Sequence, residues 1–356
     1  MLPAVAAAAL LGTVVVAGVA GGFGDDGSSG GDDTTTTIAT STSLAATTTA
    51  VVQTVPTTAP VVKTALVQTI GEGSYGNDVT MVQERLKALG FDPGPIDGQF
   101  GGLTRAAVWA FEKLVMQTPR DDATGRVSND MWQRMQDPLV IQPRRPDAGS
   151  ANHTEVYLPE QVVIFFVDDE PALISHMASG DDEEWCEEVT ISPGEIGNED
   201  GTEPLKKGEC GRSNTPGGVF EYYRRVEGVR ESALGGMWNP VYFNYGVAIH
   251  GALNVPLQPA SHGCIRIPLK LSEHFQELVT DGDQVFVFDG VKEPEAYGAQ
   301  LPTFNWRDPS YTTTTTAPTT TLPPPATQPP ATQAPPAATT VAPAPAVTTT
   351  TAAPAT

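Results

Sequence analysis

The stretch from His250 to Ile267 reads HGALNVPLQPASHGCIRI, and it carries the most informative chemistry of the chain. His250 precedes Cys264 by fourteen residues, and Cys264 closes the tetrapeptide that begins at Ser261. A thiol is a useful nucleophile only as a thiolate, and a nearby imidazole can take its proton or stabilise its charge. Gly263 leaves room for a substrate and for backbone N–H groups that converge on a developing oxyanion. The stretch therefore contains, within one short segment, the residue types that acyl transfer by a cysteine nucleophile requires.

Two plainer explanations of these residues have to be weighed. Taken as lone residues, a cysteine and two histidines favour the plainer interpretation of a core thiol with surface imidazoles, and the spacing of His262 and Cys264 could suit zinc. Zinc is disfavoured because the region offers only three obvious soft ligands and no paired C-x-x-C or H-x-x-x-H motif. We expect neither a metal ion nor an organic cofactor.

The N-terminal segment is apolar. Leu2 to Ala20 contain no charged residue and are rich in Ala, Val and Leu, which suits either a signal-peptide core or a membrane anchor. Gly18 to Ala20 offer small residues for cleavage, yet no Lys or Arg precedes the run. Residues 1–23 are therefore predicted to be a signal peptide or a membrane anchor, and both imply export.

The cysteine count fits an exported chain. Three cysteines leave one unpaired after a single bridge. Cys264 is the candidate for the odd thiol, so Cys186 and Cys210, which lie in a polar insertion, are expected to form a disulfide. Closing a loop of that size stabilises by about 3 kcal/mol in the chain-entropy model.

Composition limits both the partners and the folded parts. The formal net charge is -22, and affinity for nucleic acid comes from Lys and Arg, so we expect no nucleic acid partner. Segments rich in Thr, Pro and Ala lack core residues, which predicts disorder for residues 24–68 and 291–356. Two compact regions remain, residues 69–137 and 154–290, joined by a Pro-containing linker at residues 138–153.

Several polar residues receive no chemical role. Arg144 and Arg145 in the linker are expected to be solvated. His153, His176 and His274 have no partner motif nearby, and we interpret them as ordinary surface or core residues.

The first compact region has the periodicity of short helices. Val79, Val82, Leu86 and Leu89 recur at helical spacing, and Gly90 supplies a left-handed cap that ends the helix. This pattern predicts the first of three helices.

Two more helices are predicted downstream. One is expected to start after Leu103, with Thr104 as its N-cap and an apolar stripe that reaches Leu114. A third, capped by Ser128, is expected to extend to Met135. Together the helices predict a small all-α module.

This module resembles the peptidoglycan-binding domain family. The residues that carry the resemblance are Gly76, Asp78, Val79, Val82-Gln83, Leu86, Leu89-Gly90-Phe91, Asp97-Gly98-Gln99-Phe100-Gly101, Thr104, Ala107-Val108 and Phe111. The resemblance implies that the module as a whole binds the cell wall, while its individual residues are mainly structural.

The second compact region is predicted to be mostly β. Its short, apolar, turn-bounded segments are Glu155–Leu158 and Val162–Val167, which suggest a hairpin, then Val189–Ile191, Gly218–Tyr223, Val241–Phe243, Val247–Ile249 and Gln284–Phe288. One helix is expected at Leu269–Val279, introduced by Pro268.

This region resembles the L,D-transpeptidase catalytic domain of the YkuD type. His250-Gly251 followed by Ser261-His262-Gly263-Cys264 matches the catalytic signature of that family, and Ser213–Phe220 resembles its upstream Thr-Pro-Gly strand entry. The similarity spans roughly residues 155–289.

The resemblance implies a role for each matched residue. Cys264 would be the nucleophile and His250 the general base, oriented by the carbonyl of Gly251. Ser261 would support the catalytic loop, and the N–H groups of His262, Gly263 and Cys264 would bind the oxyanion. His262 would line the site, in a structural or a proton-transfer role. Arg266 would meet a substrate carboxylate.

The resemblance also implies a function in the cell wall. The expected partners are the stem peptides and the glycan of peptidoglycan, and the expected reaction is cross-linking of two stems through an acyl-thioester on Cys264. Two alternatives are an L,D-carboxypeptidase, in which water is the acceptor, and a wall-binding protein with an inactive catalytic domain.

Overall fold

The computed structural model describes residues 51–54, 62–146, 151–194, 198–232, 234–303 and 306–311. The predicted signal peptide or membrane anchor at residues 1–23 lies outside these ranges, as does most of the Thr-rich sequence at both ends. Among the helices within these ranges, none has both the length and the apolar character that crossing a membrane requires.

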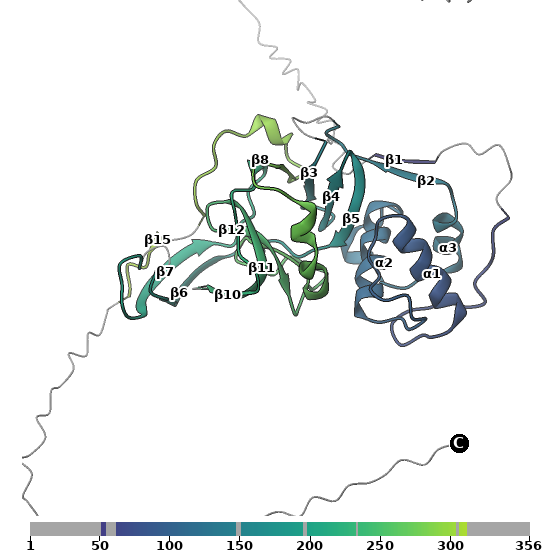
Figure 1. The fold of residues 1–356 in the computed structure, drawn as a ribbon, viewed down its shortest axis with the longest axis horizontal. Helices are drawn as coiled ribbons and strands as arrows, with labels where there is room; N and C mark the ends of the chain where they lie inside the picture. The colour runs from purple at the N-terminus through teal and green to yellow at the C-terminus, as the bar shows by residue number, and fades with distance from the viewer. Residues whose placement is uncertain are drawn as a thin grey trace, which may run out of the picture. The chain divides into compact units, whose positions relative to one another are not determined.

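Three helices form the N-terminal module, as predicted. They are α1 (Asn77–Ala88), α2 (Gly102–Leu114) and α3 (Asn129–Met135), labelled in Figure 1. Gly90, with φ of 90°, follows the end of α1, where a left-handed residue costs glycine little. The side chain of Ser128 accepts a hydrogen bond from the N–H of Met131 and so caps α3.

The prediction that Thr104 is an N-cap is wrong. The N-cap of α2 is Gly101, and Thr104 lies inside the helix with 1% of its surface exposed. Its hydroxyl donates to the carbonyl of Pro93 at 3.0 Å and accepts from Nε2 of Gln83 at 3.2 Å. A buried hydroxyl needs such partners, so Thr104 ties α2 to the turn before it.

The first large sheet is buried on both faces. Its order is β5 (Glu170–His176), β4 (Val162–Val167), β3 (His153–Tyr157), β14 (Gln284–Phe288) and β8 (Gly218–Glu221). Only β3 and β14 run parallel. Because successive side chains alternate between faces, the unbroken apolar run of β4 needs cover on both sides.

The second sheet carries the predicted catalytic motif. Its order is β10 (Val229–Ser232), β11 (Gly235–Asn244), β12 (Val247–Ala252) and β13 (Ile265–Pro268), and β9 (Arg224–Arg225) also pairs with β11. One face of each sheet contributes to a common core. That core includes Val163 and Phe165 from the first sheet and Val241, Ile249 and Ile265 from the second.

The opposite face of the first sheet shares a core with the helical module. Ile164, Phe166 and Ile174 belong to the same buried cluster as Phe91 and Phe111. The N–H of Ile174 also donates to the carbonyl of Gly90 at 2.8 Å. The second region has its own core between its two sheets, and in addition the helices cover the opposite face of the first sheet.

Parts of the predicted linkers are ordered strands. β1 (Val51–Thr54), within the predicted disordered segment 24–68, pairs antiparallel with β2 (Leu139–Gln142), within the predicted linker 138–153. Leu139 and Ile141 are buried in the shared core, which a scan for Thr and Pro content overlooks.

The expectation that Arg144 and Arg145 are simply solvated is wrong. Both guanidinium groups form ion pairs with Glu293, and Arg145 also pairs with Glu295. Both also lie over the ring of Phe288. Charged side chains separated by about 150 residues therefore hold the linker against the end of the sheet.

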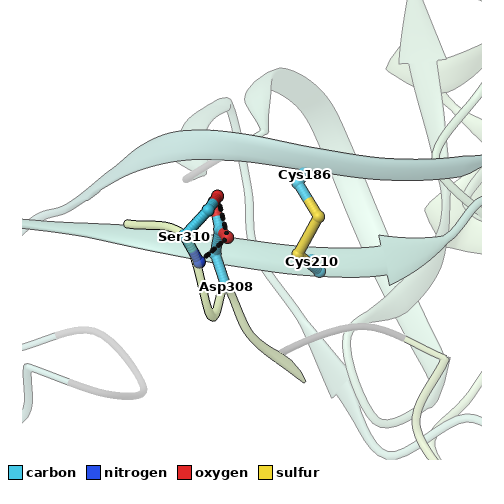
Figure 2. The surroundings of a disulfide bond; sticks show 4 residues. All are labelled: Cys186, Cys210, Asp308 and Ser310. Carbon is cyan, nitrogen blue, oxygen red and sulfur yellow. Dashed lines mark hydrogen bonds between the residues drawn. A yellow bond between two sulfur atoms is a disulfide. The ribbon is translucent and has the colours of Figure 1, made fainter. Parts of the chain in front are cut away.

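The polar insertion forms a third sheet. β6 (Glu184–Ile191) and β7 (Leu205–Arg212) make an antiparallel hairpin, and β15 (Trp306–Arg307) pairs with β7. Cys186 and Cys210 face each other across the hairpin and form a disulfide with Cα atoms 4.1 Å apart (Figure 2). The predicted disordered tail 291–356 thus includes an ordered strand, because Trp306 and Arg307 pair with β7.

The predicted helix at Leu269–Val279 is wrong. Two 3₁₀ turns stand there, Leu269–Glu273 and Phe275–Leu278, separated by His274 with φ of -136°. Leu271 and Phe275 are nevertheless buried in the core between the two sheets, so these two apolar residues, four positions apart, correctly indicate a buried face. The segment satisfies the core with two tight turns and does not need an α-helix.

Candidate active site

The candidate catalytic motif spans β12, the connecting loop and the start of β13, two adjacent parallel strands. β12 and β13 pair with His250 opposite Arg266 and Ile249 opposite Ile265. Since side chains alternate along a strand, Cys264 lies on the same face as Arg266 and His250. Ile249 and Ile265 fill the sandwich core on the other face. The alternation of polar and apolar residues thus separates the candidate chemistry from the core.

A cavity of about 780 Å³ opens over this polar face. Cys264, His250, Ser261, His262 and Arg266 all line it. The structure therefore brings the five side chains of the predicted site into one concave surface, which is large enough for a peptide ligand.

His250 has a defined hydrogen-bond partner. Its Nδ1 lies 2.9 Å from the carbonyl oxygen of Gly251, which can only accept, so Nδ1 carries the proton and Nε2 is left to take one. Burial lowers the pKa of His250 to about 4, the positive charge of Arg266 adds to this, and the bond to Gly251 opposes it. The imidazole is therefore neutral at pH 7, and its Nε2 can accept a proton.

Cys264 is the free cysteine among the described residues, and it is half-buried. Its Sγ lies 3.7 Å from the carbonyl oxygen of Gly246. Burial raises the pKa of this thiol, while a backbone hydrogen bond and the charges of Arg266 and Arg230 partly offset that effect. The resting thiol is therefore uncharged at pH 7, and a base that removes its proton would activate it.

Hydrogen bonds within the Ser261–Cys264 segment and from Thr215 hold this segment in place. The hydroxyl of Ser261 donates to the carbonyl of Cys264 and accepts from the N–H of Gly263 at 3.1 Å. Thr215 donates to the carbonyl of Gly263 at 2.6 Å and accepts from the N–H of Gly180 at 3.0 Å. The N–H of Gly263, implied above as an oxyanion donor, is therefore engaged within the loop.

Two glycines of the motif have steric reasons to be glycine. Gly263 has φ of 124°, and a Cβ there would lie 2.8 Å from the carbonyl oxygen of Asn214. A Cβ on Gly251 would lie 2.1 Å from Oγ of Ser272. Any side chain at either position would displace the backbone that holds the cysteine and the histidine.

Two regions of the chain match known protein families. Residues 151–287 match the L,D-transpeptidase catalytic domain family, known as YkuD, and residues 75–135 match the peptidoglycan binding domain family. Residues 151–287 are thereby identified as an L,D-transpeptidase catalytic domain. The catalytic motif, the cavity and the braced loop all lie within it.

Solved structures resemble the chain to different degrees. An L,D-transpeptidase from Xylanimonas cellulosilytica is 27% identical with a TM-score of 0.51, and the match covers 64% of this chain and 100% of that one. An L,D-transpeptidase (Yku) from Stackebrandtia nassauensis is 20% identical with a TM-score of 0.33, and the match covers 62% and 94%. None of the curated proteins matches the chain.

The disulfide-linked hairpin contacts the motif of the L,D-transpeptidase domain directly. The ring of Trp185 packs edge-on against His262, with centroids 5.0 Å apart, and Nε2 of His262 lies 3.5 Å from a carboxylate oxygen of Glu187. Ile191 and Lys207 of the same hairpin line the cavity. The insertion therefore forms one wall of the transpeptidase cavity.

Sequence reasoning missed two arginines of the candidate site. Arg224 and Arg230 line the cavity beside Arg266, together with Glu209 and Glu231. Arg230 bonds to the hydroxyl of Tyr242, and both guanidinium groups lie over the ring of that tyrosine. No local pattern marks these arginines, because β9, β10 and β11 reach the cysteine only through sheet pairing.

One group of potential metal ligands occurs among the described residues. Cys186, Cys210 and Asp308 place one ligand atom each within 4.8 Å of one another. The two sulfur atoms are bonded to each other, as Figure 2 shows, so they are not available as thiolates. The side chain of Asp308 instead accepts bonds from the N–H and the hydroxyl of Ser310.

Proposed function

We propose that this chain cross-links peptidoglycan as an L,D-transpeptidase with Cys264 as its nucleophile. The observation that carries the proposal is that Cys264, which directly precedes β13, lines one cavity together with His250 of β12 and Arg266 of β13. This arrangement lies in the region that matches the L,D-transpeptidase catalytic domain family.

Acylation starts from an uncharged pair of groups. Nε2 of His250 takes the proton of the Cys264 thiol, and the sulfur attacks the carbonyl after the third residue of a tetrapeptide stem. Backbone N–H groups of His262 and Cys264 stabilise the oxyanion. The C–N bond then breaks, and D-alanine leaves with the proton that His250 returns to its nitrogen. An acyl-thioester remains on Cys264.

Transfer completes the cycle. A side-chain amine of a second stem gives a proton to His250 and attacks the thioester carbonyl. The C–S bond breaks, the proton returns to sulfur, and the new amide joins the third residues of two stems. The balance requires neither a metal ion nor an organic cofactor, because only an acyl group and protons are exchanged.

The charges of the cavity suit an anionic peptide. Arg224, Arg230 and Arg266 gather there in a chain of formal net charge -22. Guanidinium groups bind carboxylates with paired hydrogen bonds, and stem peptides carry carboxylates at the leaving D-alanine. We assign Arg266 to that carboxylate, since it is opposite the general base.

The location follows from the substrate. Residues 75–135 match a peptidoglycan binding domain family, so this module would hold the catalyst beside insoluble glycan and raise its effective concentration. We therefore place the protein in the cell wall after export, with residues 1–23 as signal peptide or membrane anchor.

Two other functions make different predictions. An L,D-carboxypeptidase would form the same acyl-enzyme but transfer it to water. A wall-binding protein with an inactive catalytic domain would form no acyl-enzyme. The neutral base and the free thiol in one cavity favour catalysis over binding alone.

The deciding experiment uses the full chain. It is incubated with a disaccharide tetrapeptide, and the protein and the products are followed by mass spectrometry beside Cys264→Ala. A cross-linked dimer with loss of D-alanine, and an acyl adduct on the protein, both absent from the variant, are expected. Loss of D-alanine without dimer would indicate the carboxypeptidase, and an unmodified, folded protein would overturn the proposal.

A further inference from the structure

Helix α2 of the helical module buries the side-chain amine of a lysine against the transpeptidase domain. Lys113 is only 1% exposed. Its Nζ donates to the carbonyl of Gln161 at 2.9 Å and lies 2.7 Å from Nδ1 of His176. Burial lowers the pKa of Lys113 to about 7, and a lysine is almost never this buried unless its amine has partners. Here both partners belong to the other domain, so the contact joins the two matched regions.

His176 passes this contact on to the active-site loop. It is 1% exposed, and burial together with the charge of Lys113 lowers its pKa to about 3, so the ring is neutral. Since Nδ1 accepts from Lys113, the proton is on Nε2, which donates to the carbonyl of Pro256 at 3.0 Å. Pro256 lies in the middle of the loop 253–260, which connects the general base to Ser261.

Gln161 forms a second branch that reaches the end of the same loop. Its side-chain oxygen accepts from the N–H of Ser179 at 2.8 Å, and its amide donates to the Ser179 hydroxyl at 2.8 Å. The carbonyl of Ser179 accepts from the N–H groups of Ala260 and Ser261 at 2.9 and 3.0 Å. The two branches from Lys113 thus hold the loop at its middle and at its junction with the nucleophile motif.

Further contacts come from the same module. The amide of Gln258 in the loop donates to a carboxylate oxygen of Asp121 at 2.8 Å. The ring of Trp109, one turn before Lys113 on α2, packs edge-on against His176 with centroids 5.1 Å apart. The helical module therefore touches the loop directly and encloses the histidine that holds it.

We propose that Lys113 is a positioning residue for the transpeptidase reaction, and that through His176 and Gln161 it fixes the loop between His250 and Ser261. The helical module would then be part of the catalytic apparatus and not only a wall anchor. This inference rests on the proposed function, because the loop matters for catalysis only if Cys264 and His250 react.

The test compares three variants of the full chain. Lys113→Met keeps the buried stem and removes the donor, and His176→Phe keeps a ring and removes both bonds. The matched control is Lys63→Met, which removes an ammonium that binds the carbonyl of Gln133 and the carboxylate of Asp137, away from the transpeptidase domain. Acyl-enzyme formation and hydrogen exchange of the loop amides are measured for each.

Lys113→Met and His176→Phe are expected to slow acylation at saturating substrate by about ten- to a hundredfold, with a much smaller change in half-saturation. The amides of Ala260 and Ser261 should exchange faster in both, while thermal unfolding stays cooperative. Lys63→Met should match the wild type in both measurements.

Normal acylation and normal exchange in both variants would overturn the inference, and so would equal losses in Lys63→Met, since that pattern reports general destabilisation. If Lys113→Met does not fold, His176→Phe decides by the same measurements; if neither folds, the network is structural and the inference fails. Hydrogen exchange needs no substrate, so an inactive wild type would sink the proposed function and still leave the loop contact measurable.

Discussion

The candidate base and nucleophile are both uncharged at rest. Burial lowers the pKa of His250 to about 4 and raises that of the Cys264 thiol. A preformed thiolate–imidazolium pair would need the opposite shifts. The site therefore depends on proton transfer when substrate arrives, and on the geometry that makes this transfer possible.

We expect the alkylation of Cys264 by iodoacetamide to reflect this state. Since the reagent needs the thiolate and the pKa of the thiol is raised, the rate should keep climbing with pH through about 9. Rates would be measured between pH 5 and 10, with Cys264→Ala as the control for other sites. A plateau that begins near pH 7 would instead show a stabilised thiolate and contradict the neutral pair.

Thr215 is expected to matter although it does not contact the sulfur in any described hydrogen bond. Thr215→Val removes the donor to the carbonyl of Gly263 and the acceptor for the N–H of Gly180. Loss of these buried bonds should lower the free energy of unfolding by about 1–3 kcal/mol. Acylation should slow by about tenfold as the loop loosens.

The control for Thr215→Val is Thr190→Val, an exposed position on β6. Urea unfolding and acylation assays would be run on both variants. Unchanged acylation in a destabilised Thr215→Val protein would separate the stability of the loop from its catalytic role.

At the scale of elements, the hairpin of β6 and β7 links a disulfide to one wall of the cavity. Its Trp185 and Glu187 contact His262, and its Cys186–Cys210 bond ties the two strands together. Because no described residue of this hairpin belongs to the core between the two large sheets, the hairpin can change shape without disturbing that core. The hairpin therefore affects substrate binding more than chemistry in our interpretation.

We expect the double variant Cys186→Ser/Cys210→Ser to bind stem peptide more weakly. Its half-saturation concentration should rise several-fold, while acylation at saturation changes little, because His250 lies on β12 and Cys264 directly precedes β13, both outside the hairpin. The chain-entropy model gives a loss of about 3 kcal/mol for a loop of this size. A large fall in the saturated acylation rate would instead place the hairpin in the catalytic step.

The same element shows where sequence reasoning stops. The disulfide of the hairpin was predictable from the cysteine count. Strands in Val189–Ile191, Val247–Ile249 and Gln284–Phe288 were also predictable, because runs of β-branched and aromatic residues indicate buried strands. The second strand of the hairpin, LKKGECGR, has no such run, since most of its stability comes from pairing with β6. A polar strand that depends on its partner leaves little local signal.

At the scale of the whole molecule, two histidines tie stability to pH. The pKa values of His250 and His176 fall to about 4 and about 3 in the fold, against about 6.5 in an unfolded chain. Between these values the unfolded state binds more protons, so the free energy of unfolding decreases as pH falls. Above about pH 6.5 their contribution is fully present.

Acidification from pH 7.5 to 5 should therefore lower the free energy of unfolding by a few kcal/mol, before most carboxylates titrate. Urea unfolding at several pH values would measure this slope. His176→Phe should flatten it, because one of the two groups is gone. An equal slope in the variant would mean that other groups cause the acid sensitivity.

The shared core predicts that the transpeptidase domain is not independent. A fragment of residues 151–311 would expose Ile164, Phe166 and Ile174, which pack with the helical module in the intact chain. We expect it to bind a hydrophobic dye and to lose a sharp thermal transition, whereas the full chain unfolds cooperatively. A fragment with the midpoint of the full chain would contradict this.

Much of the site was readable from the motif, while its surroundings were not. The order of His250, Gly251 and Ser261–Cys264 marked the candidate reacting groups, because the proposed chemistry requires those residue types close together. Lys113 and His176 carried no such signal. A lysine on an apolar helix and a histidine ending a strand become partners only after the sheet and the helix pack.

The core shared by the helical module and the first sheet also limits which recombinant chains can fold. A genetic crossover between residues 137 and 151 would leave both family-matched regions intact, since it falls between them. In the folded chain it would combine a helical module and a transpeptidase domain from different proteins, whose contact surfaces are not complementary. Ancestry of the two halves should therefore agree, and successful chimaeras should exchange α2 and β5 together.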